Sequence, residues 1–340
     1  MRKIKFILKR IKEMDYKAFF SEINKLHKKS HKCRIYLFFD IISCGFKYGA
    51  GYKDYELYEF YNLTPAQRAT YVVRTTNNLV IAHCNDKNYY HCMNDKVEFN
   101  ERYSEFIKRD WLDFRTASKE DFIRFIDGKK AIIVKPVDAS CGVGVQKITV
   151  NGVESYDSIY NELKQTQGAD LLEDYVIQHH EMSALYPHSV NTCRIMTLLK
   201  NSDVHIVFAA IRIGNHGKVV DNINNGGIFA PIDIKTGTVV YQGCDKDGNT
   251  YQEHPMTGHK ICGFEIPYWN ESIEMCKKAA LITPQLRYCG WDVAITEDGP
   301  IFIECNQMPG YDIMQLPAHT PDKIGMLPEY RKLLSDEMKL

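Results

Sequence analysis

The stretch GWDVAITEDGPIFIECNQMPG (290–310) constrains the fold most, because it sets two acids and an asparagine inside what is otherwise a pair of apolar strands. A favoured three-residue hairpin turn over 297–299, whose last residue is a left-handed glycine, places Asp292 directly across from Glu304. A two-residue turn over 298–299 would instead put these two acids on opposite faces. We predict the three-residue turn, and therefore a carboxylate pair on one face of the hairpin.

Asn306 follows Glu304 by two residues, so its side chain is expected on the same face of the strand. Two opposed carboxylates repel each other unless a proton or a cation lies between them. Oxygen ligands at this spacing suit Mg²⁺. A solvent-facing polar strand is the alternative that the hairpin alone leaves open. The apolar face is predicted to hold Trp291, Val293, Ile295, Ile301, Ile303 and Cys305.

Composition describes an ordinary globular chain of 340 residues, 44% hydrophobic and 25% charged, which is long enough for two or three domains. Acids and bases balance at 43 each, so bulk charge gives no reason to expect a nucleic-acid partner. The eleven cysteines are scattered singly, as reduced core thiols are. Since no stretch approaches the length of a membrane span, we expect a cytoplasmic protein.

Two local patterns leave alternatives open. Residues 1–34 hold twelve Lys/Arg against three acids, with interleaved apolar residues. They predict a basic amphipathic helix, which either makes peripheral contact with an anionic membrane or packs as a solvated helix on the N-terminal domain.

In HCNDKNYYHC, the pairs His83-Cys84 and His91-Cys92 are either metal ligands or a polar loop with core thiols.

The predicted organisation is α+β. Helical signals dominate up to about residue 125, with caps at Thr64-Pro65 and at Ser118 with Asp121. From residue 131 the period changes, and a helix from roughly 272 to 286 precedes the hairpin. Strands are predicted at 131–135, 144–150, 171–176, 193–200 and 205–213, with a helix at 155–165. The predicted segments are 1–35 (basic helix), 36–125 (mostly helical), 126–183 (central α+β unit) and 184–340 (antiparallel sheet).

Small residues after a strand-end lysine form a second constellation. VKPVDASCGVGV places Lys135 before a loop with Ser140, Gly142 and Gly144, whose N–H groups can approach a phosphate closely. A Gly-rich hairpin turn is the plainer explanation. In LLEDYVIQHHEM, Glu173 and Glu181 follow a strand edge, which can offer a carboxylate to adenine and a later acid to ribose; an exposed strand end is the alternative.

Arginines stand inside two apolar strands. A buried guanidinium cannot lose its charge, so Arg194 and Arg212 are expected to face a cleft that carries phosphates or carboxylates. The loop with Asp221, Asn222 and Asn225 can line the same cleft.

The order of these features resembles the ATP-grasp superfamily: lysine and Gly-rich hairpin, LLEDYV, arginine strands, then an acid followed by Glu-x-Asn. SVNTCRIMTLL, VVDNINNGGIFAPID and HPMTGHKICGFEIP resemble more closely the sugar-transfer-associated ATP-grasp family, relatives of proteins linked to polysaccharide and capsule assembly. The second half is also similar to the glutamate-ligase branch. The resemblance implies an α+β ATP-grasp fold, with ATP and Mg²⁺ held between the central unit and the C-terminal sheet.

The resemblance also implies residue roles. Lys96 and Lys135 would contact the phosphates and adenine of ATP, and Ser140, Gly142 and Gly144 would close over the phosphates. Glu173 and the backbone near Val176 would hold adenine, and Glu181 the ribose. Asp292, Glu304 and Asn306 match the Mg²⁺ ligands, and Arg194, Arg212 and Asn222 would line the transfer site.

Three functions follow as hypotheses. The first is an ATP-dependent ligase that joins a carboxylate to an amine or hydroxyl through an acyl phosphate, acting on a small-molecule or lipid-linked glycan substrate. The second is a kinase that uses the same nucleotide site. The third is a non-catalytic nucleotide-binding scaffold of a glycan assembly complex, against which the intact metal triad argues.

Overall fold

The computed structural model describes residues 15–139, 142–150 and 156–340, and it groups them into two compact units. The smaller unit joins the residues before 84 to residues 310–340, and the larger unit is 84–309. Residues 310–340, which we assigned to the C-terminal sheet segment, therefore group with the N-terminal helices. The boundaries after 35, 125 and 183 stay predictions. Residues 1–14 of the predicted basic helix lie outside the described residues.

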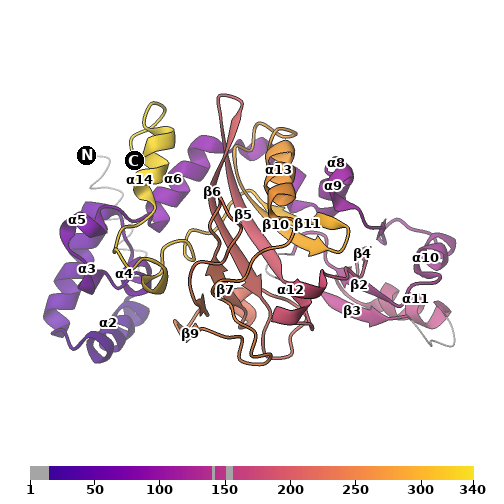
Figure 1. Ribbon diagram of the computed structural model, residues 1–340, viewed down its shortest axis with the longest axis horizontal. Coiled ribbons are helices and arrows are strands. Elements are labelled where there is room, and N and C mark those ends of the chain that lie inside the picture. Colours follow the sequence, from indigo (N-terminus) through magenta and orange to yellow (C-terminus); the bar gives the residue numbers. More distant parts are fainter. Residues whose placement is uncertain (1–14, 140–141, 151–155) are drawn as a thin grey trace. The chain divides into compact units, whose positions relative to one another are not determined.

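The smaller unit is helical (Figure 1). Thr64 caps its helix with Gln67 in a reciprocal capping box, and Pro65 takes the first helical position, as predicted. None of the helices that the structure describes is both long and apolar enough to cross a membrane. The α-helices are α2 (Tyr16–Ser30), α3 (Arg34–Tyr48), α4 (Tyr52–Leu57), α5 (Pro65–Arg68), α6 (Arg74–Cys84, ending at the unit boundary) and α14 (Leu327–Leu334); η1 (Phe60–Asn62) and η4 (Pro317–His319) are 3₁₀ turns.

A four-stranded antiparallel sheet forms one part of the larger unit, in the order β1-β4-β2-β3. Its strands are β1 (Trp111–Asp113), β2 (Ala131–Lys135), β3 (Gln146–Thr149) and β4 (Leu171–Asp174). Helices α10 (Lys119–Ile126) and α11 (Tyr156–Gln165) bury Phe122, Ile159 and Leu163 against Ile132 and Leu172 of this sheet. Ser118 and Asp121 form the predicted capping box of α10.

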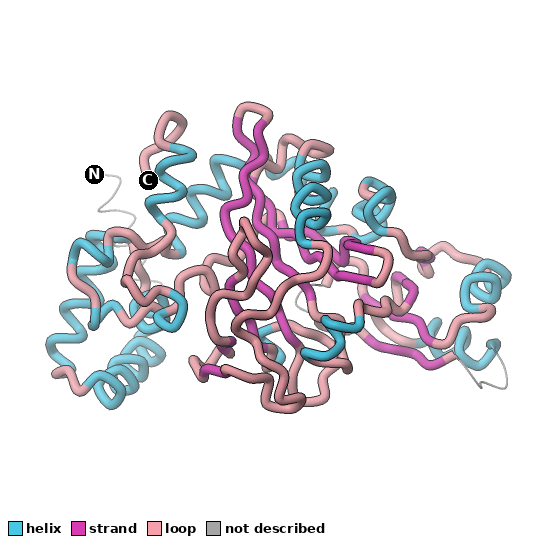
Figure 2. Tube along the Cα trace, in the orientation of Figure 1, coloured by secondary structure: helices cyan, strands magenta, loops and turns pink. Residues whose placement is uncertain are grey.

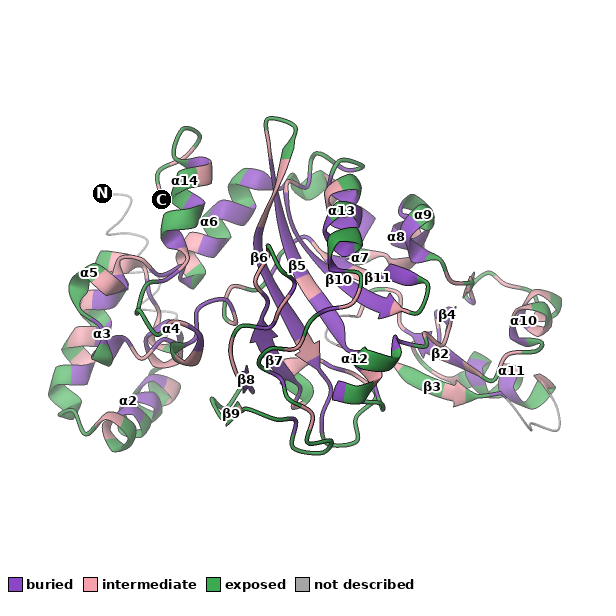
Figure 3. Cartoon of the chain, viewed as in Figure 1, coloured by how far each residue is buried: buried purple, intermediate pink, exposed green. Residues whose placement is uncertain are grey.

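A seven-stranded antiparallel sheet forms the other part, in the order β11-β10-β5-β6-β7-β8-β9. Figure 2 shows its strands at the centre of the larger unit, and Figure 3 shows β5, β6 and β10 largely buried. The strands are β5 (Thr192–Lys200), β6 (Asp203–Ile213), β7 (Ile228–Pro231), β8 (Gly243–Cys244), β9 (Thr250–Tyr251), β10 (Tyr288–Thr296) and β11 (Gly299–Asn306). The strands predicted at 193–200 and 205–213 are confirmed.

Short helices and one long helix pack with this second sheet. Helix α13 contacts β5, β6, β10 and β11 and buries Trp269, Ile273 and Cys276 in the shared core. The helix predicted at 272–286 is observed at Trp269–Ala280, so it begins and ends earlier than predicted. Its end precedes Pro284, because the residue before a proline is disfavoured in a helix. The helices are α7 (His91–Asn94), α8 (Lys96–Arg102), α9 (Ser104–Ile107), α12 (His180–Leu185) and α13 (Trp269–Ala280), with 3₁₀ turns η2 (Lys87–Tyr89) and η3 (Ile223–Asn225).

The β10–β11 hairpin confirms the predicted acid pair by a different route. Thr296 pairs with Gly299, so the connection is a two-residue turn, Glu297-Asp298, and the predicted three-residue turn is wrong. A bulge then shifts the register between Val293 and Asp292. Because this bulge inserts one extra residue in β11, Asp292 pairs with Glu304 after all.

The bulge also corrects the predicted apolar face. Ile303 is the residue without a partner in the ladder, and Phe302 pairs with Val293. Phe302 is fully buried and stacks on Trp291 with ring centroids 4.8 Å apart. Ile301 and Ile303, which we placed on that face, are absent from the core that Trp291, Val293, Ile295, Phe302 and Cys305 share.

Candidate active site

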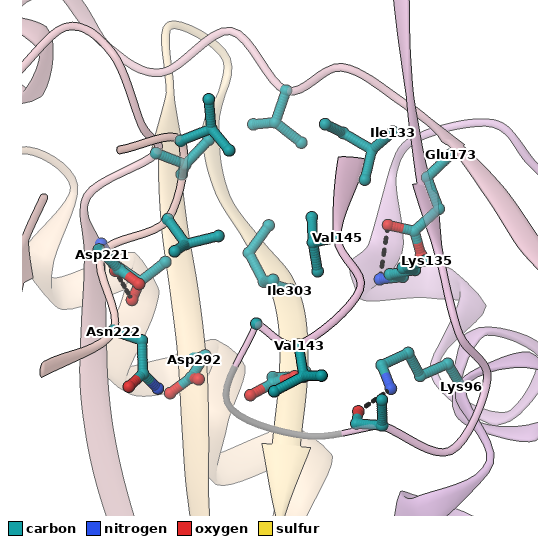
Figure 4. Close-up of a pocket in the computed structure, with 18 of the residues that line it drawn as sticks. Lys96, Ile133, Lys135, Val143, Val145, Glu173, Asp221, Asn222, Asp292 and Ile303 are labelled. Atoms are coloured by element: carbon teal, nitrogen blue, oxygen red, sulfur yellow. Dashed lines mark hydrogen bonds and ion pairs between the residues drawn. The ribbon is translucent and has the colours of Figure 1, made fainter. Parts of the chain in front are cut away.

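A cavity of about 150 Å³ lies within the larger unit, between its two sheets (Figure 4). The small sheet contributes the ends of β2 and β4 and the loop after β2. The large sheet contributes β5, β6, β10 and β11 and the loop before η3. The lining side chains include Lys96, Ile133, Lys135, Gly142, Val143, Val145, Glu173, Val176, Thr192, Arg212, Asp221, Asn222, Asp292, Ile303 and Glu304. One cavity thus collects most of the chemistry-bearing residues that the sequence singled out.

Glu173 anchors the small-sheet side of the cavity. Its carboxylate lies 2.7 Å from Lys135 Nζ and 3.0 Å from Arg109 Nη2, and it also accepts a hydrogen bond from Asn100 at 3.0 Å. Burial alone would raise the pKa of Glu173, but Arg109 and Lys135 outweigh it and hold this pKa at about 2. Glu173 is therefore ionised and fixes the position of Lys135.

Lys96 and Lys135 are the two lysines of the cavity. Lys96 begins α8 and donates through Nζ to the carbonyls of Val137 and Ala139 in the loop after β2. Burial lowers the pKa of both lysines, and the acids around them counteract it. Figure 4 shows both ammonium groups on the same side of the cavity. This side therefore offers two partly desolvated cations to an anionic ligand.

Asp292 occupies the opposite side, between two arginines. Pairing of β10 with β5 places Asp292 across from Arg194, whose Nε and Nη2 donate to it at 2.5 and 3.1 Å. Arg212 Nη2 donates to the same carboxylate at 2.6 Å. Burial would raise the pKa of Asp292, but the two guanidinium groups hold it below its usual range. Both arginines therefore have a carboxylate partner, but of the two only Arg212 lines the cavity, so the expectation that both face a ligand cleft stays a prediction.

Asp221 extends this cluster. Its Oδ2 accepts from the backbone N–H and the hydroxyl of Thr192 at 2.9 and 2.5 Å, and it lies 3.6 Å from Arg212 Nε. Thr192 Oγ1 in turn accepts from Arg212 at 2.8 and 3.0 Å. Burial raises the pKa of Asp221, and Asp292 adds to this rise. Two arginines thus face three carboxylates, which leaves an excess of negative charge.

Glu304 carries that excess. Burial raises its pKa, and the neighbouring Asp292 raises it further. Asp292 and Glu304 lie opposite each other in the β10–β11 ladder, so two carboxyl groups share one side of the cavity. A divalent cation suits the same position, because it removes the repulsion without adding a proton. These oxygen donors therefore fit Mg²⁺.

The three predicted metal ligands fit unequally. Asp292 is fully buried, and its two oxygens already accept three hydrogen bonds from arginines, which leaves little capacity for a metal. Asn306 pairs with Gly290, and its side-chain oxygen accepts from Met308 N at 2.8 Å. Asn306 does not line the cavity. Glu304 is thus the most available of the three.

Three other predicted residues that the structure describes fall outside the cavity lining: Glu181, Arg194 and Gly144. Glu181 is exposed in the first turn of α12, 3.9 Å from His179, so its predicted ribose contact has no support from the cavity. Arg194 reaches the site through Asp292. Gly144 borders the loop with φ +76°, where an added Cβ would lie 2.7 Å from Pro136. Ser140 lies outside the described residues.

Sequence reasoning missed Arg109 and Asn100, which hold Glu173, and the role of Thr192 between Asp221 and Arg212. Arg109 follows a lysine at the end of a helical stretch, so its sequence context predicts a solvent-exposed side chain. Its side chain is in fact only 3% exposed. No local pattern distinguishes it, because its partners are 64 or more residues away in the chain.

The two His-Cys pairs do not form one cluster. His91 and Cys92 lie with Glu98, their ligand atoms within 4.8 Å of one another. His83 instead lies 3.0 Å from Glu337 within the smaller unit. Metal binding by these residues stays a prediction.

Comparison with known proteins places the chain in a family. The model of the sugar-transfer associated ATP-grasp family matches residues 67–323. The chain therefore belongs to this family, and its two-sheet α+β architecture is the ATP-grasp fold. No curated protein sequence matches it.

Solved structures of several ATP-grasp proteins are similar to the chain. The ligase PsnB with minimal precursor, Mg and ADP has 12% identity and a TM-score of 0.41, covering 74% of this chain and 61% of PsnB. The L-amino acid ligase from Bacillus licheniformis has 10% identity and a TM-score of 0.43, covering 73% and 50%. The D-alanyl-alanine synthetase A from Vibrio cholerae has 14% identity and a TM-score of 0.44, covering 72% and 65%. The matches span less than two thirds of each of these proteins.

Proposed function

We propose that the protein is an ATP-dependent ligase that joins a carboxylate to an amine or hydroxyl through an acyl phosphate, with a sugar or a polysaccharide precursor as one partner. The observation that carries the proposal is the cavity, which sets two lysines on one side against an arginine–carboxylate cluster on the other, in a chain of the ATP-grasp family. The family's description as sugar-transfer associated supports the glycan substrate.

ATP would occupy the small-sheet side. Lys96 and Lys135 neutralise its phosphates, and the backbone N–H groups around Gly142 approach them closely. Adenine lies against Glu173 and Val176, with the apolar side chains of Ile133 and Ile303 available to pack on the ring. The cavity volume of about 150 Å³ is below the range of about 300–1,000 Å³ usual for ligand pockets, so binding must widen it.

Mg²⁺ would be held by Glu304 first, with the remaining lone pair of Asp292, and Asn306 would have to turn from Met308 N toward the cavity to join them. The ion neutralises charge on the phosphates of the bound nucleotide. Asp292 has the further task of holding Arg194 and Arg212 in place, which its three hydrogen bonds perform. This division agrees with the opposite directions in which the pKa values of the two carboxyl groups are moved, down for Asp292 and up for Glu304.

The reaction needs no covalent bond to the enzyme. An oxygen of the substrate carboxylate attacks the γ-phosphorus, the bond to ADP breaks, and an acyl phosphate forms. The amine or hydroxyl then attacks the acyl carbon, and phosphate leaves with the former carboxylate oxygen. Arg212, and Arg194 beside it, stabilise the oxyanion that forms on the carbonyl oxygen when the acyl carbon is attacked, while Asn222 orients the acceptor.

Oxygen labelling tests the proposal. The purified protein is incubated with ATP, Mg²⁺, an amino-sugar or amino-acid acceptor and a panel of ¹⁸O-labelled amino acids and uronates. A ligase that uses an acyl phosphate transfers one labelled oxygen to inorganic phosphate, which mass spectrometry detects. A stable phosphorylated product with no label in inorganic phosphate would instead establish the kinase. No ADP formation with any substrate would favour the non-catalytic scaffold.

A further inference from the structure

Helix α3 is apolar on two opposite sides. Its inner side buries Leu37, Ile41 and Cys44 within the smaller unit. On the opposite side Ile35, Phe39, Ile42 and Phe46 follow one another at intervals of four, three and four residues, which aligns them on one face. These four side chains are 68%, 64%, 37% and 57% exposed. A helix of this kind needs a second apolar environment, which the described residues do not provide.

The exposed surface continues onto α2. Phe20, 52% exposed, stacks on Phe38 with ring centroids 6.2 Å apart. Phe38 meets Phe39 edge to face at 5.3 Å, so the rings of the two helices are in contact. We call this surface the aromatic face; it comprises Tyr16, Phe20, Ile35, Phe39, Ile42 and Phe46. Single exposed apolar residues are ordinary, but a contiguous patch marks an interaction site.

Positive charge predominates on the two helices that carry the aromatic face. The only acids within α2 and α3 are Glu22, which is buried, and Asp40, which is paired with Arg68 at 2.7 Å. Neither is therefore presented to a partner. The exposed lysines of the two helices and of the loop between them are Lys17, Lys25, Lys28, Lys29, Lys32 and Lys47, of which Lys25 and Lys29 pair with Glu56 and Glu59. An aromatic surface bordered by lysines is complementary to an apolar layer covered by anions.

We propose that the aromatic face docks on the surface of an anionic lipid bilayer. Phe39 and Phe46 enter the boundary between acyl chains and headgroups, and the surrounding lysines lie at the level of the lipid phosphates. Apolar burial and charge attraction then add, and neither alone gives firm binding. The surface belongs to the smaller unit, so the proposal is independent of the proposed ligase activity. The sequence analysis expected membrane contact through residues 1–34, whereas this proposal assigns the contact mainly to α3.

Vesicle flotation tests the proposal with a matched pair of variants. Vesicles of phosphatidylcholine with phosphatidylglycerol are compared with phosphatidylcholine alone. The wild type binds the anionic vesicles, and added salt weakens binding. Phe39→Ser with Phe46→Ser lowers the partition coefficient at least about tenfold. The control, Leu79→Ser with Leu281→Ser, changes residues of similar exposure elsewhere and leaves binding unchanged.

Lys32→Glu with Lys47→Glu supplies a second variant that alters charge alone, and it should abolish the preference for anionic vesicles. Circular dichroism and thermal unfolding confirm that each variant is folded. Absence of binding to anionic vesicles overturns the proposal. Unchanged binding of the Phe39→Ser, Phe46→Ser variant also overturns it, because residues 1–14 would then suffice. A dimer detected by light scattering and lost in that variant identifies a second copy as the occupant instead.

Discussion

Asp292 and Glu304 face each other across two strands, yet their surroundings move their pKa values in opposite directions. Arg194 and Arg212 hold the pKa of Asp292 low against the effect of burial. Burial and Asp292 raise that of Glu304. One carboxylate therefore stabilises the fold through the arginines, whereas the other is destabilising until a proton or a cation joins it.

Neutral isosteres separate these two effects. Asp292→Asn leaves the guanidinium group of Arg194 without its anion and that of Arg212 with Asp221 alone, and should lower the free energy of unfolding by about 3–5 kcal/mol. Glu304→Gln removes only a carboxylate that the site disfavours, so stability without metal should stay the same or rise. Urea denaturation of the metal-free protein at neutral pH measures both.

Equal destabilisation by both substitutions would contradict the assignment of separate roles. Arg68→Lys serves as a reference for the loss of a paired arginine in the smaller unit, because Arg68 binds Asp40 through two nitrogens at 2.7 and 2.8 Å. It should destabilise the protein without changing nucleotide binding.

The pH dependence of stability should reveal Glu173. Its pKa is about 2 in the folded chain against 4.5 unperturbed. Between these values the unfolded chain binds more protons, so the stabilisation is complete above pH 4.5 and is lost as pH falls toward 2. The loss attributable to Glu173 is about 3 kcal/mol. The free energy of unfolding, measured by urea denaturation at several pH values in this range, should fall less steeply with decreasing pH for Glu173→Gln than for the wild type. An equal slope in both proteins would contradict the ion network around Glu173.

Single residues were predictable where their local setting was anomalous. Arginines inside apolar strands indicated anionic partners, and Asp292 is that partner for both. Arg109 was not predictable, since it stands among polar residues at a helix end and meets Glu173 only through the fold. The exposed position of Glu181 could not be anticipated either, because a strand exit does not specify where the following helix begins.

Among elements, the hairpin shows where sequence patterns reach their limit. Alternation of apolar residues predicted both strands, and the assumed three-residue turn predicted the pairing of Asp292 with Glu304. The alternation also placed Ile301 and Ile303 in the core. A bulge interrupts the alternation at Ile303, and nothing in the residue types announces it, because Phe302 and Ile303 are both apolar. The site depends on this bulge, which compensates for the shorter turn.

Alanine substitutions distinguish the observed register from the predicted one. Phe302→Ala should cost about 3–5 kcal/mol, because its ring is fully buried against Trp291. Ile303→Ala should cost clearly less stability, since its side chain lines the cavity, but should weaken nucleotide binding. Thermal or urea denaturation and nucleotide titration give the two readouts. If Ile303→Ala were more destabilising than Phe302→Ala, the bulge would be contradicted and the regular hairpin register supported.

At the scale of the whole molecule, the change from helical to strand periodicity at residue 131 correctly located β2 and the strands after it, but it missed β1, which lies in the segment predicted to be mostly helical. The association of residues 310–340 with the N-terminal helices was not predictable, because it rests on contacts between distant segments. Gln315 is an example. Its side chain is fully buried. The side-chain oxygen accepts hydrogen bonds from the N–H groups of Val72 and Met326, and the side-chain nitrogen donates one to the carbonyl of Val72.

Removing that amide should loosen the smaller unit. Gln315→Ala leaves buried backbone groups of Val72 without partners, at a cost of about 1–3 kcal/mol for each unsatisfied group. Gln165→Ala, at an exposed position in α11, should change stability by less than about 0.5 kcal/mol. Hydrogen exchange of residues 70–73 should quicken in the first variant alone. Equal protection in both variants would refute the structural role of Gln315.

The central claim is that Glu304 in this cavity holds the metal that accompanies ATP. Isothermal titration calorimetry of ATP with and without Mg²⁺ tests it most directly, in the wild type, Glu304→Gln and the control Glu271→Gln on the exposed side of α13. We predict that Mg²⁺ strengthens ATP binding to the wild type and the control, and that Glu304→Gln loses this strengthening while remaining folded. An undiminished effect of Mg²⁺ in Glu304→Gln would contradict the claim.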